Sequence, residues 1–173
     1  MKLLLPVLLL LSACSSPTKL PPVRTVPYVD LPKYMGAWYV IGTIPWFVEK
    51  NNVGTMDIYK LRPDGKIATT YVYHKKSLDA PRKEMKLVGT VKNKTTNSEW
   101  GMQFLWPFQA PFLIIGLSED YQTTIVGHPS RNLIWIMSRK PTMSEKDYDR
   151  ALSDAARQGY DTSRIVKVPQ RTL

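Results

Sequence analysis

The chain has 173 residues, 43% of them hydrophobic and 22% charged, which suits one domain with an ordinary hydrophobic core. Its formal charge of +10 is spread along the sequence, and this favours attraction to an anionic surface over a nucleic-acid site. Because Cys14 is the only cysteine, no disulfide can form within the chain.

Residues 1–13 have the pattern of a signal peptide. Lys2 precedes the apolar run 3–11, and small residues follow at 12 and 13. The run is much shorter than the roughly 20 residues of a transmembrane helix. Leu11-Ser12-Ala13-Cys14 resembles a bacterial lipoprotein signal, which implies cleavage before Cys14 and attachment of diacylglycerol to its sulfur. The alternative is that Cys14 is a buried structural cysteine.

Residues 14–30 are expected to form a tether after this lipid-modified cysteine. Prolines at 17, 21, 22 and 27 stand among small and basic residues, a composition that favours extended chain and packs no core. Ser15 is not the aspartate that retains lipoproteins of this class in the inner membrane. The resemblance therefore implies a lipid anchor in the outer membrane, on its periplasmic face.

From Gly36 onward, short apolar and β-branched runs alternate with turn residues, and this pattern predicts strands. The turn Arg62-Pro63-Asp64-Gly65 suits a hairpin, because proline presets φ and glycine accepts the left-handed position. The expected strands are 37–46, 53–61, 66–74, 84–92, 98–106, 112–118, 122–127 and 132–139. Eight such strands with little helix between them predict an all-β, antiparallel up-and-down barrel, since closure protects the sheet edges.

One helix is expected after the strands. Thr142 or Ser144 can cap its start, and Gly159 offers a C-terminal stop. Its apolar side chains at helical spacing are Tyr148, Leu152 and Ala155 or Ala156. A single apolar stripe gives a single packing face, so the helix should lie outside the barrel. A short final strand, 165–168, should pair beside the sheet.

Three sequence motifs resemble those of the lipocalin family, in the family's order. They are Gly36-Ala37-Trp38-Tyr39, Asp120-Tyr121 and Trp135-Ile136-Met137-Ser138-Arg139. The helix and Gly159-Tyr160-Asp161 resemble the bacterial outer-membrane lipocalins, which are related to apolipoprotein D of animals. The resemblance covers nearly all of residues 30–168 and implies a lipocalin domain over 31–173. Unlike the animal proteins, which usually carry disulfides, this chain has none to offer.

The resemblance implies that the motif residues Gly36, Trp38 and Arg139 form the floor of the barrel. In lipocalins a tryptophan of the first strand plugs the closed end, and an arginine from the last strand lies across its ring. A guanidinium over an indole contributes roughly 0.5 to 2 kcal/mol. We therefore expect a structural role for these residues.

An eight-stranded barrel of this type has room for one small ligand, so inward-facing residues are the candidate binding site. The register of Arg139 sends alternate residues of the last strand inward, and the same parity applied to the other strands predicts a pocket of apolar and aromatic side chains. The candidate ligand-binding residues are Tyr59, Tyr71, Tyr73, Leu87, Trp100, Met102, Phe104, Phe112, Ile114, Leu133, Trp135 and Met137.

The second strand is ambiguous. Its hydrophobicity would send Met56 and Ile58 inward, whereas the resemblance sends Asp57 and Tyr59 inward, and we prefer Tyr59. An inward Asp57 would need a partner or would take up a proton, because an unpaired buried carboxylate is costly. Otherwise Asp57 lies near the rim or faces solvent.

The loops at the open end are expected at 45–52, 74–83, 106–111 and 128–131. One is basic through Lys75, Lys76, Arg82 and Lys83, and another contains Trp106-Pro107-Phe108. Such residues suit a membrane surface or anionic amphiphiles. The alternative is a solvated loop with an aromatic lid that packs inward.

Catalytic and metal-binding motifs are absent from the sequence, and no cofactor is indicated. The first hypothesis is therefore a lipid-anchored lipocalin that binds a fatty acid, a lysophospholipid or a similar amphiphile and stores or transports it in the bacterial envelope. Its partners would be this ligand and the membrane, without nucleic acid. The alternatives are a lipocalin-fold enzyme acting on a lipid and a structural lipoprotein without ligand. The sequence leaves a homodimer open.

Overall fold

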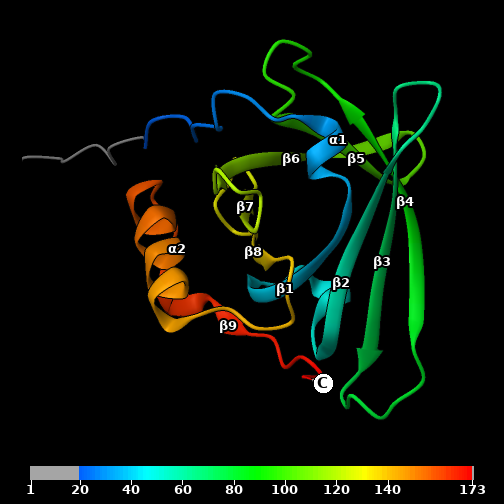
Figure 1. Cartoon of the computed structure of the whole chain (residues 1–173), viewed down its shortest axis with the longest axis vertical. Coiled ribbons are helices and arrows are strands. Elements are labelled where there is room, and N and C mark those ends of the chain that lie inside the picture. The colour runs from blue at the N-terminus through cyan, green and yellow to red at the C-terminus, as the bar shows by residue number, and fades with distance from the viewer. Residues whose placement is uncertain (1–19, 173) are drawn as a thin grey trace, which may run out of the picture.

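The computed structural model describes residues 20–172, in which nine strands form one antiparallel sheet. Each strand from β2 to β7 pairs with the next, and β1 pairs with both β8 and β2, so that the first eight strands close into a barrel (Figure 1). The strands are β1 Gly36–Ile44, β2 Asn52–Leu61, β3 Ile67–Lys75, β4 Lys83–Val91, β5 Glu99–Leu105, β6 Phe108–Leu117, β7 Thr123–Gly127, β8 Ile134–Ser138 and β9 Val166–Lys167.

The predicted fold class is confirmed, with strand ends that differ by a few residues. The largest difference is in β6, which begins at Phe108 because β5 and β6 extend together as a hairpin past the predicted start at 112. Three short helical segments were not predicted: α1 Leu31–Tyr34, η1 Phe47–Glu49 and η2 Thr162–Arg164. They are single turns, which leave no helical periodicity in the sequence.

Side chains that alternate along the strands form two separate cores. The inner core lies inside the barrel and contains Trp38, Tyr59 and Trp100. The outer core contains Ile125, Ile134 and Ile136, which lie on the other face of β7 and β8. The barrel wall is therefore covered on both sides where the helix lies against it.

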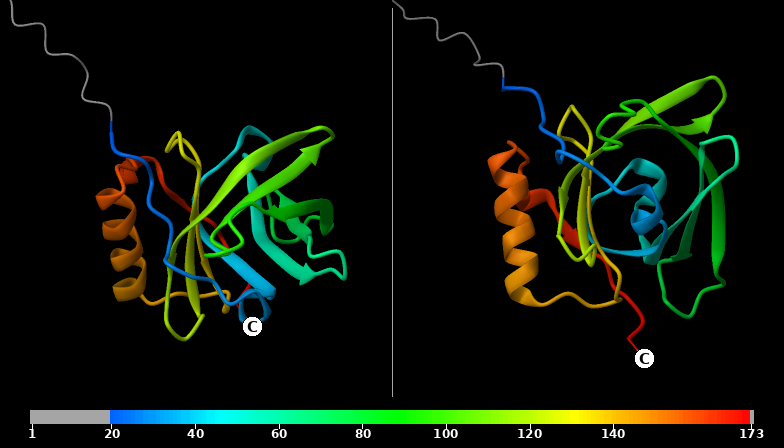
Figure 2. Two further views of the ribbon diagram at one scale, coloured as in Figure 1. Left: turned by 90° about the horizontal axis from the view of Figure 1, so that it is seen from above. Right: turned by 45° about the horizontal axis from the view of Figure 1, so that its top comes forward.

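Helix α2, Glu145–Arg157, lies outside the barrel, as Figure 2 shows in both of its views. The Ser144 side chain accepts a hydrogen bond from the amide of Asp147, so Ser144 is the N-cap and Thr142 is not. The buried face consists of Tyr148, Ala151 and Ala155. Leu152 is half-buried against this core, and Ala156 is exposed. Gly159 follows the helix with a φ of +84°.

The proposed tether is wrong for residues 21–30, because this segment packs along the outside of the barrel. The Val26 amide donates to the Ile114 carbonyl at 2.9 Å, and the Val29 amide to the Thr96 carbonyl at 2.8 Å. Val29 is fully buried, and Val26 packs against the inner core. The composition argument missed these two valines between the prolines.

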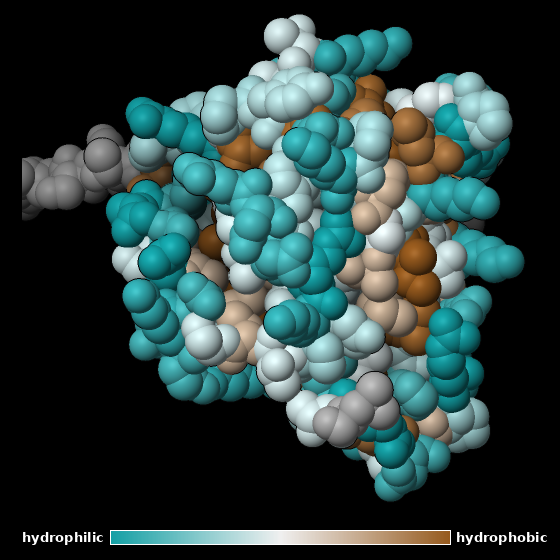
Figure 3. Space-filling model, viewed as in Figure 1, coloured by the Kyte–Doolittle hydropathy of each residue, from teal (hydrophilic) through white to brown (hydrophobic). Residues whose placement is uncertain are grey.

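The signal peptide, Cys14 and the first part of the tether lie outside the described residues. Within residues 20–172, no helix is both long enough and apolar enough to cross a membrane. Hydrophilic residues cover most of the face seen in Figure 3, with hydrophobic side chains in separate patches.

Candidate functional site

One end of the barrel is closed by α1, which the chain forms just before it enters β1 (Figure 2). The Asp30 side chain caps this turn by accepting from the Lys33 amide, and Pro32 suits its first residues. Tyr34 is thereby directed into the barrel, where it is fully buried. Its carbonyl accepts a hydrogen bond of 2.8 Å from the indole nitrogen of Trp38.

The three predicted motifs meet at this closed end. The Arg139 guanidinium lies 3.7 Å from the centre of the Trp38 ring, in the position that the resemblance implied. It donates to the carbonyls of Ala37 at 2.9 Å and Tyr121 at 3.3 Å, and also to two carbonyls of α1. Gly36 has a φ of +97°, and a Cβ there would lie 3.3 Å from the guanidinium. Arg139 therefore joins β1, α1 and the β6–β7 turn at the floor of the barrel.

Aromatic rings fill the barrel above this floor. Tyr59 and Trp100 are 1% exposed, with ring centres 5.6 Å apart, and both contact Tyr34. They were predicted to bind ligand, but they are packed into the floor and do not line the cavity. Ile114 and Met137 are fully buried in the same core and do not line the cavity either.

A cavity lies between this aromatic floor and the open end. Its inner chamber has a volume of about 40 Å³ and its outer chamber about 200 Å³, with several walls in common. The residues that line both are Trp46, Glu49, Met102, Phe104, Phe112 and Trp135. The inner chamber adds Val48, Asp57, Thr69, Tyr71, Met85 and Leu87, and the outer adds Ala110, Pro111, His128 and Leu133.

The sequence-predicted residues divide accordingly. Those on the cavity walls are Tyr71, Leu87, Met102, Phe104, Phe112, Leu133 and Trp135. Tyr73 is half-buried near the open end, where its ring stacks on Tyr71 with centres 5.3 Å apart, and it lines neither chamber. Parity fixed which side chains point inward, but it did not indicate how high above the floor each one lies.

Sequence reasoning missed the wall contributed by η1. After β1 the chain turns back into the barrel mouth, so that Trp46, Val48 and Glu49 line the cavity. Glu49 accepts hydrogen bonds from the Trp46 amide at 2.9 Å and the Trp135 indole nitrogen at 3.1 Å. Burial raises the pKa of Glu49 above its usual range. The pattern Trp46-Phe47-Val48-Glu49 gave only a loop, because one turn carries no periodic signal.

The ambiguity of β2 is resolved by the cavity. Tyr59 points inward as preferred, and Asp57 lines the inner chamber, so its placement at the rim or in solvent is wrong. The Tyr59 hydroxyl donates to the Asp57 carboxylate at 2.8 Å. Burial, opposed by this hydrogen bond, raises the pKa of Asp57 to about 7.

This raised pKa links the fold to pH. The carboxyl group binds its proton more tightly in the folded chain than at its ordinary pKa of 3.8. The stabilising contribution of that proton is therefore full below about pH 4 and is lost as the pH rises to about 7. Asp57 is thus an internal acid that titrates near neutrality.

The loops at the open end carry exposed aromatic and basic side chains. Trp106 is 82% exposed, Phe108 72% and Phe47 74%. The alternative of an aromatic lid that packs inward is therefore wrong for Trp106 and Phe108. Lys75, Lys76, Arg82 and Lys83 are also exposed, although Arg82 pairs with Glu84 at 2.6 Å.

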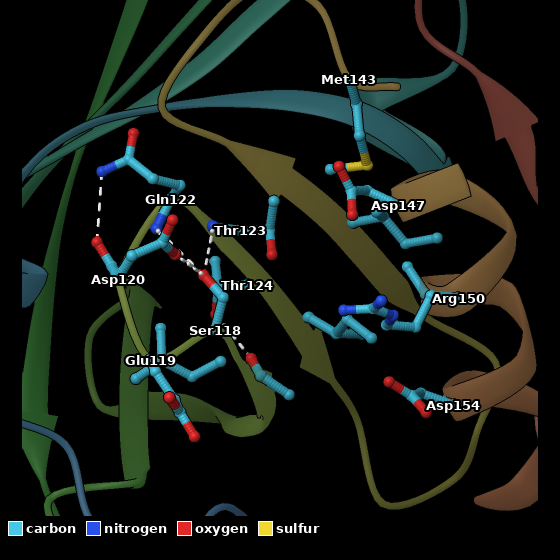
Figure 4. Close-up of a pocket in the computed structure, with 15 residues that line it drawn as sticks. Ser118, Glu119, Asp120, Gln122, Thr123, Thr124, Met143, Asp147, Arg150 and Asp154 are labelled. Atoms are coloured by element: carbon cyan, nitrogen blue, oxygen red, sulfur yellow. Dashed lines mark hydrogen bonds between the residues drawn. The ribbon is translucent and has the colours of Figure 1, made fainter. Parts of the chain in front are cut away.

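A second hollow, of about 590 Å³, lies outside the barrel between the β6–β7 turn and α2. Figure 4 shows Asp120 and Gln122 on one side of it and Asp147, Arg150 and Asp154 from α2 on the other. The Asp120 carboxylate already accepts from the Ser118 hydroxyl at 2.6 Å and the Gln122 amide at 3.1 Å. Hydrogen bonds from Ser118 and Gln122 lower its pKa. Asp120 therefore stabilises the β6–β7 turn.

Metal ligands do not gather anywhere in residues 20–172: no three His, Cys, Asp or Glu side chains there could hold an ion. The interior of the barrel is accordingly the best-formed candidate site, an apolar cavity with a few polar groups.

Comparison with known proteins identifies relatives over most of the chain. The model of the lipocalin-like domain family matches residues 29–170. Outer membrane lipoprotein Blc of Escherichia coli (strain K12) is 31% identical over 162 residues, which cover 93% of this chain and 90% of that protein. Temperature-induced lipocalin-1 of Arabidopsis thaliana is 30% identical over 157 residues, covering 86% of this chain and 83% of the plant protein.

Solved structures have the same fold at lower sequence identity. Insecticyanin from the tobacco hornworm Manduca sexta superposes with a TM-score of 0.70 at 18% identity, over 90% of this chain and 88% of its own. The cockroach allergen Per a 4 gives 0.64 at 21% identity, over 88% and 94%. These two likenesses support the barrel architecture alone.

Proposed function

The chain belongs to the lipocalin-like domain family, whose barrel binds small hydrophobic ligands, and on this premise we propose that it takes up one slim amphiphile in the barrel and stores or carries it in a bacterial envelope. The ligand would be a fatty acid, a lysophospholipid or a similar single-chain molecule. Its alkyl chain would occupy the two chambers between the aromatic floor and the mouth.

The observation that carries this proposal is an apolar cavity that the protein's own side chains leave unfilled. Its chambers, about 40 and 200 Å³, are below the usual range of ligand pockets, about 300 to 1,000 Å³. A slim chain therefore fits better than a bulky ring system. Burial of apolar surface contributes about 25 cal/mol per Å², so an alkyl chain binds without specific polar contacts.

Displacement of a fluorescent fatty-acid probe tests this function. The chain from Leu20 to Leu173 contains both cores and every strand that the structure describes, so it is a suitable sample. We expect saturable binding of one probe per chain, reversed by unlabelled single-chain lipids. Failure to bind the probe or any of a range of lipids would instead favour a structural lipoprotein without ligand.

A lipid-modifying enzyme is the second candidate, because the cavity contains acids with perturbed pKa values. Burial raises the pKa of both Asp57 and Glu49, and both line the inner chamber. Against this role, each carboxylate already accepts a hydrogen bond from a neighbouring aromatic side chain, Tyr59 or Trp135. Mass spectrometry of lipid recovered after incubation separates the two: binding returns the lipid unchanged, and catalysis returns a product.

We propose that a lipid on Cys14 holds the open end of the barrel against the outer membrane. The described chain begins beside this end, where Arg131 of the β7–β8 turn donates to the Pro21 carbonyl. It then runs down the barrel wall to Thr96 near the floor. Since Leu20 is six positions after Cys14, the anchor reaches at most about 20 Å from the start of this segment.

Replacing the anchoring cysteine tests the attachment. Cys14→Ser, expressed with the natural leader, should move the protein from the membrane fraction to the soluble fraction without changing its unfolding midpoint. Fractionation and thermal unfolding measure the two effects. A variant that unfolds would show that Cys14 is a core residue, and one that stays membrane-bound would contradict the lipid anchor.

The mouth itself is suited to contact the membrane surface. Its exposed side chains Phe47, Trp106 and Phe108 are aromatic, and the β3–β4 loop beside them is basic. Aromatic rings are favoured at membrane interfaces, and each basic residue near an anionic surface contributes about 1 kcal/mol. Ligand could then pass between bilayer and cavity without crossing water.

Charge reversal in the basic loop tests this orientation. Changing Lys75, Lys76, Arg82 and Lys83 to Glu should weaken binding to anionic vesicles by more than about tenfold and leave neutral vesicles unaffected. The matched control reverses four exposed basic residues at the closed end: Lys60, Arg62, Lys66 and Lys94. Vesicle co-sedimentation measures both. An equal loss in the two variants would mean that net charge, not the mouth, governs binding.

Neither the described residues nor the comparisons support the homodimer that the sequence left open, and we do not propose one.

A further inference from the structure

The inner chamber contains hydrogen-bonding groups that the fold leaves unused. The Asp57 carboxylate receives a hydrogen bond from Tyr59, although a carboxylate can accept about four. The Thr69 hydroxyl is buried without a partner, and the residue is only 2% exposed. Buried polar groups are normally paired, so unused groups on a cavity wall indicate the place of a ligand atom.

These two groups lie close together on the inward face of the barrel. In the β2–β3 register Thr69 is opposite Tyr59, and Asp57 is opposite Tyr71. Asp57 and Thr69 are therefore diagonal neighbours on adjacent strands, at about 7 Å. A single polar ligand group between them can reach both.

The surroundings of Asp57 contain acids and phenols. Glu49 approaches it from η1, Tyr59 from β2, Tyr71 from β3 and Tyr34 from α1. The Arg139 guanidinium, which lies over Trp38, is the cation that interacts with the phenols Tyr34 and Tyr59 of this cluster. Among the described residues that line the two chambers there is no Lys or Arg, and the basic side chain on the walls is His128 of the outer chamber.

We propose that Asp57 and Thr69 form a polar subsite at the inner end of the cavity, which receives a hydroxyl or ammonium group of the ligand and disfavours a carboxylate. This inference rests on the proposed function and narrows its ligand class. Both ligand groups supply the hydrogen-bond donors that Asp57 and Thr69 can accept. A carboxylate supplies none, and it meets a like charge wherever Asp57 is ionised.

The preference depends on pH because the pKa of Asp57 is about 7. Below this value Asp57 is neutral, and head-group charge matters little. Above it, Asp57 is ionised, so an ammonium group gains an opposite charge and an anionic group meets a like charge. Discrimination between the two should therefore increase as the pH rises through about 7.

Three decyl probes with different head groups test the subsite: decylamine, decanol and decylsulfonate. An amine stays protonated below its pKa of about 10 and a sulfonate stays ionised, so pH changes between about 5.5 and 8.5 report the protein. We expect the affinity ratio of amine to sulfonate to rise by more than about tenfold over this range. Decanol affinity should change little.

Asp57→Asn removes the titrating group and keeps its shape, so the amine-to-sulfonate ratio should become independent of pH. The matched control is Asp64→Asn, an exposed aspartate in the β2–β3 turn at the closed end, which should keep the wild-type profile. Thr69→Val should weaken decanol binding about fivefold and preserve the pH profile. If Asp57→Asn does not fold, the wild-type profile and Thr69→Val still decide the question.

The outcomes separate the two proposals. If all three probes bind and the affinity ratio of amine to sulfonate does not change with pH, the polar subsite is overturned and the binding function stays intact. Failure of all three to bind would overturn the proposed function itself. A wild-type profile unchanged in Asp57→Asn would assign the pH dependence to another group and contradict the subsite.

Discussion

Trp38→Ala is expected to lower the free energy of unfolding by about 3 to 5 kcal/mol, the usual cost of truncating a fully buried aromatic side chain. Trp38 is 0% exposed, and its ring lies beneath the Arg139 guanidinium at 3.7 Å. Its indole nitrogen also holds the Tyr34 carbonyl at 2.8 Å. Removal of the ring therefore takes the cation–π contact from Arg139 and one hydrogen bond from α1, and the closed end loses its plug.

Urea unfolding followed by circular dichroism measures this loss. The chain provides a matched control in Trp106→Ala, because Trp106 is 82% exposed at the mouth. That substitution should change stability by no more than about 0.5 kcal/mol. A loss below about 1 kcal/mol for Trp38→Ala would contradict the role of the floor in holding the barrel closed.

Leu133→Trp is expected to reduce the affinity for single-chain lipids by more than tenfold, equivalent to about 1.4 kcal/mol. Leu133 lines the outer chamber, whose volume is about 200 Å³. An indole there would occupy space that the ligand needs. Because the protein's own side chains leave the chamber unfilled, it can accommodate the larger side chain with little strain. Probe displacement measures the affinity, and thermal unfolding checks that the fold is retained.

The same substitution at Leu61 separates cavity filling from a general effect of added tryptophan. Leu61 is 40% exposed at the end of β2 that lies beside the closed end of the barrel. Leu61→Trp should leave the probe affinity unchanged. If Leu133→Trp binds the probe as well as Leu61→Trp does, the outer chamber is not part of the binding site.

The sequence predicted the barrel well because strands, turns and motifs are local signals. Alternation along the predicted strand 132–139 identified Leu133 and Trp135 as inward residues, and the resemblance to lipocalins implied that Arg139 lies over Trp38. The helix was equally visible, because Tyr148 and Ala155 recur at helical spacing and are buried. These features depend on residues within one element or on motifs of the family.

The shape of the cavity could not be predicted, because it depends on contacts between distant segments. Glu49 enters the barrel through a hydrogen bond to Trp135, 86 residues away. Tyr59 and Trp100 are part of the floor because Tyr34 from α1 packs against both rings. Neither hydrophobic periodicity nor turn residues in the sequence can indicate such contacts between distant segments.

The path of the N-terminal segment was also hidden from sequence. Its prolines predicted an extended chain, but extension does not decide between solvent and a protein surface. Val26 and Val29 decide it by packing on the barrel, and they bring the start of the described chain beside Arg131 at the open end. The described segment that follows the proposed anchor therefore starts beside the mouth.

The central claim, that the ligand lies inside the barrel, is tested most directly by NMR with a nitroxide-labelled alkyl chain and methyl-labelled methionines. Met85 and Met102 line the cavity, whereas Met143 lines the hollow beside α2. We predict that the bound chain broadens the methyl signals of Met85 and Met102 and leaves that of Met143 sharp. Broadening of Met143 with unchanged signals from Met85 and Met102 would contradict the account.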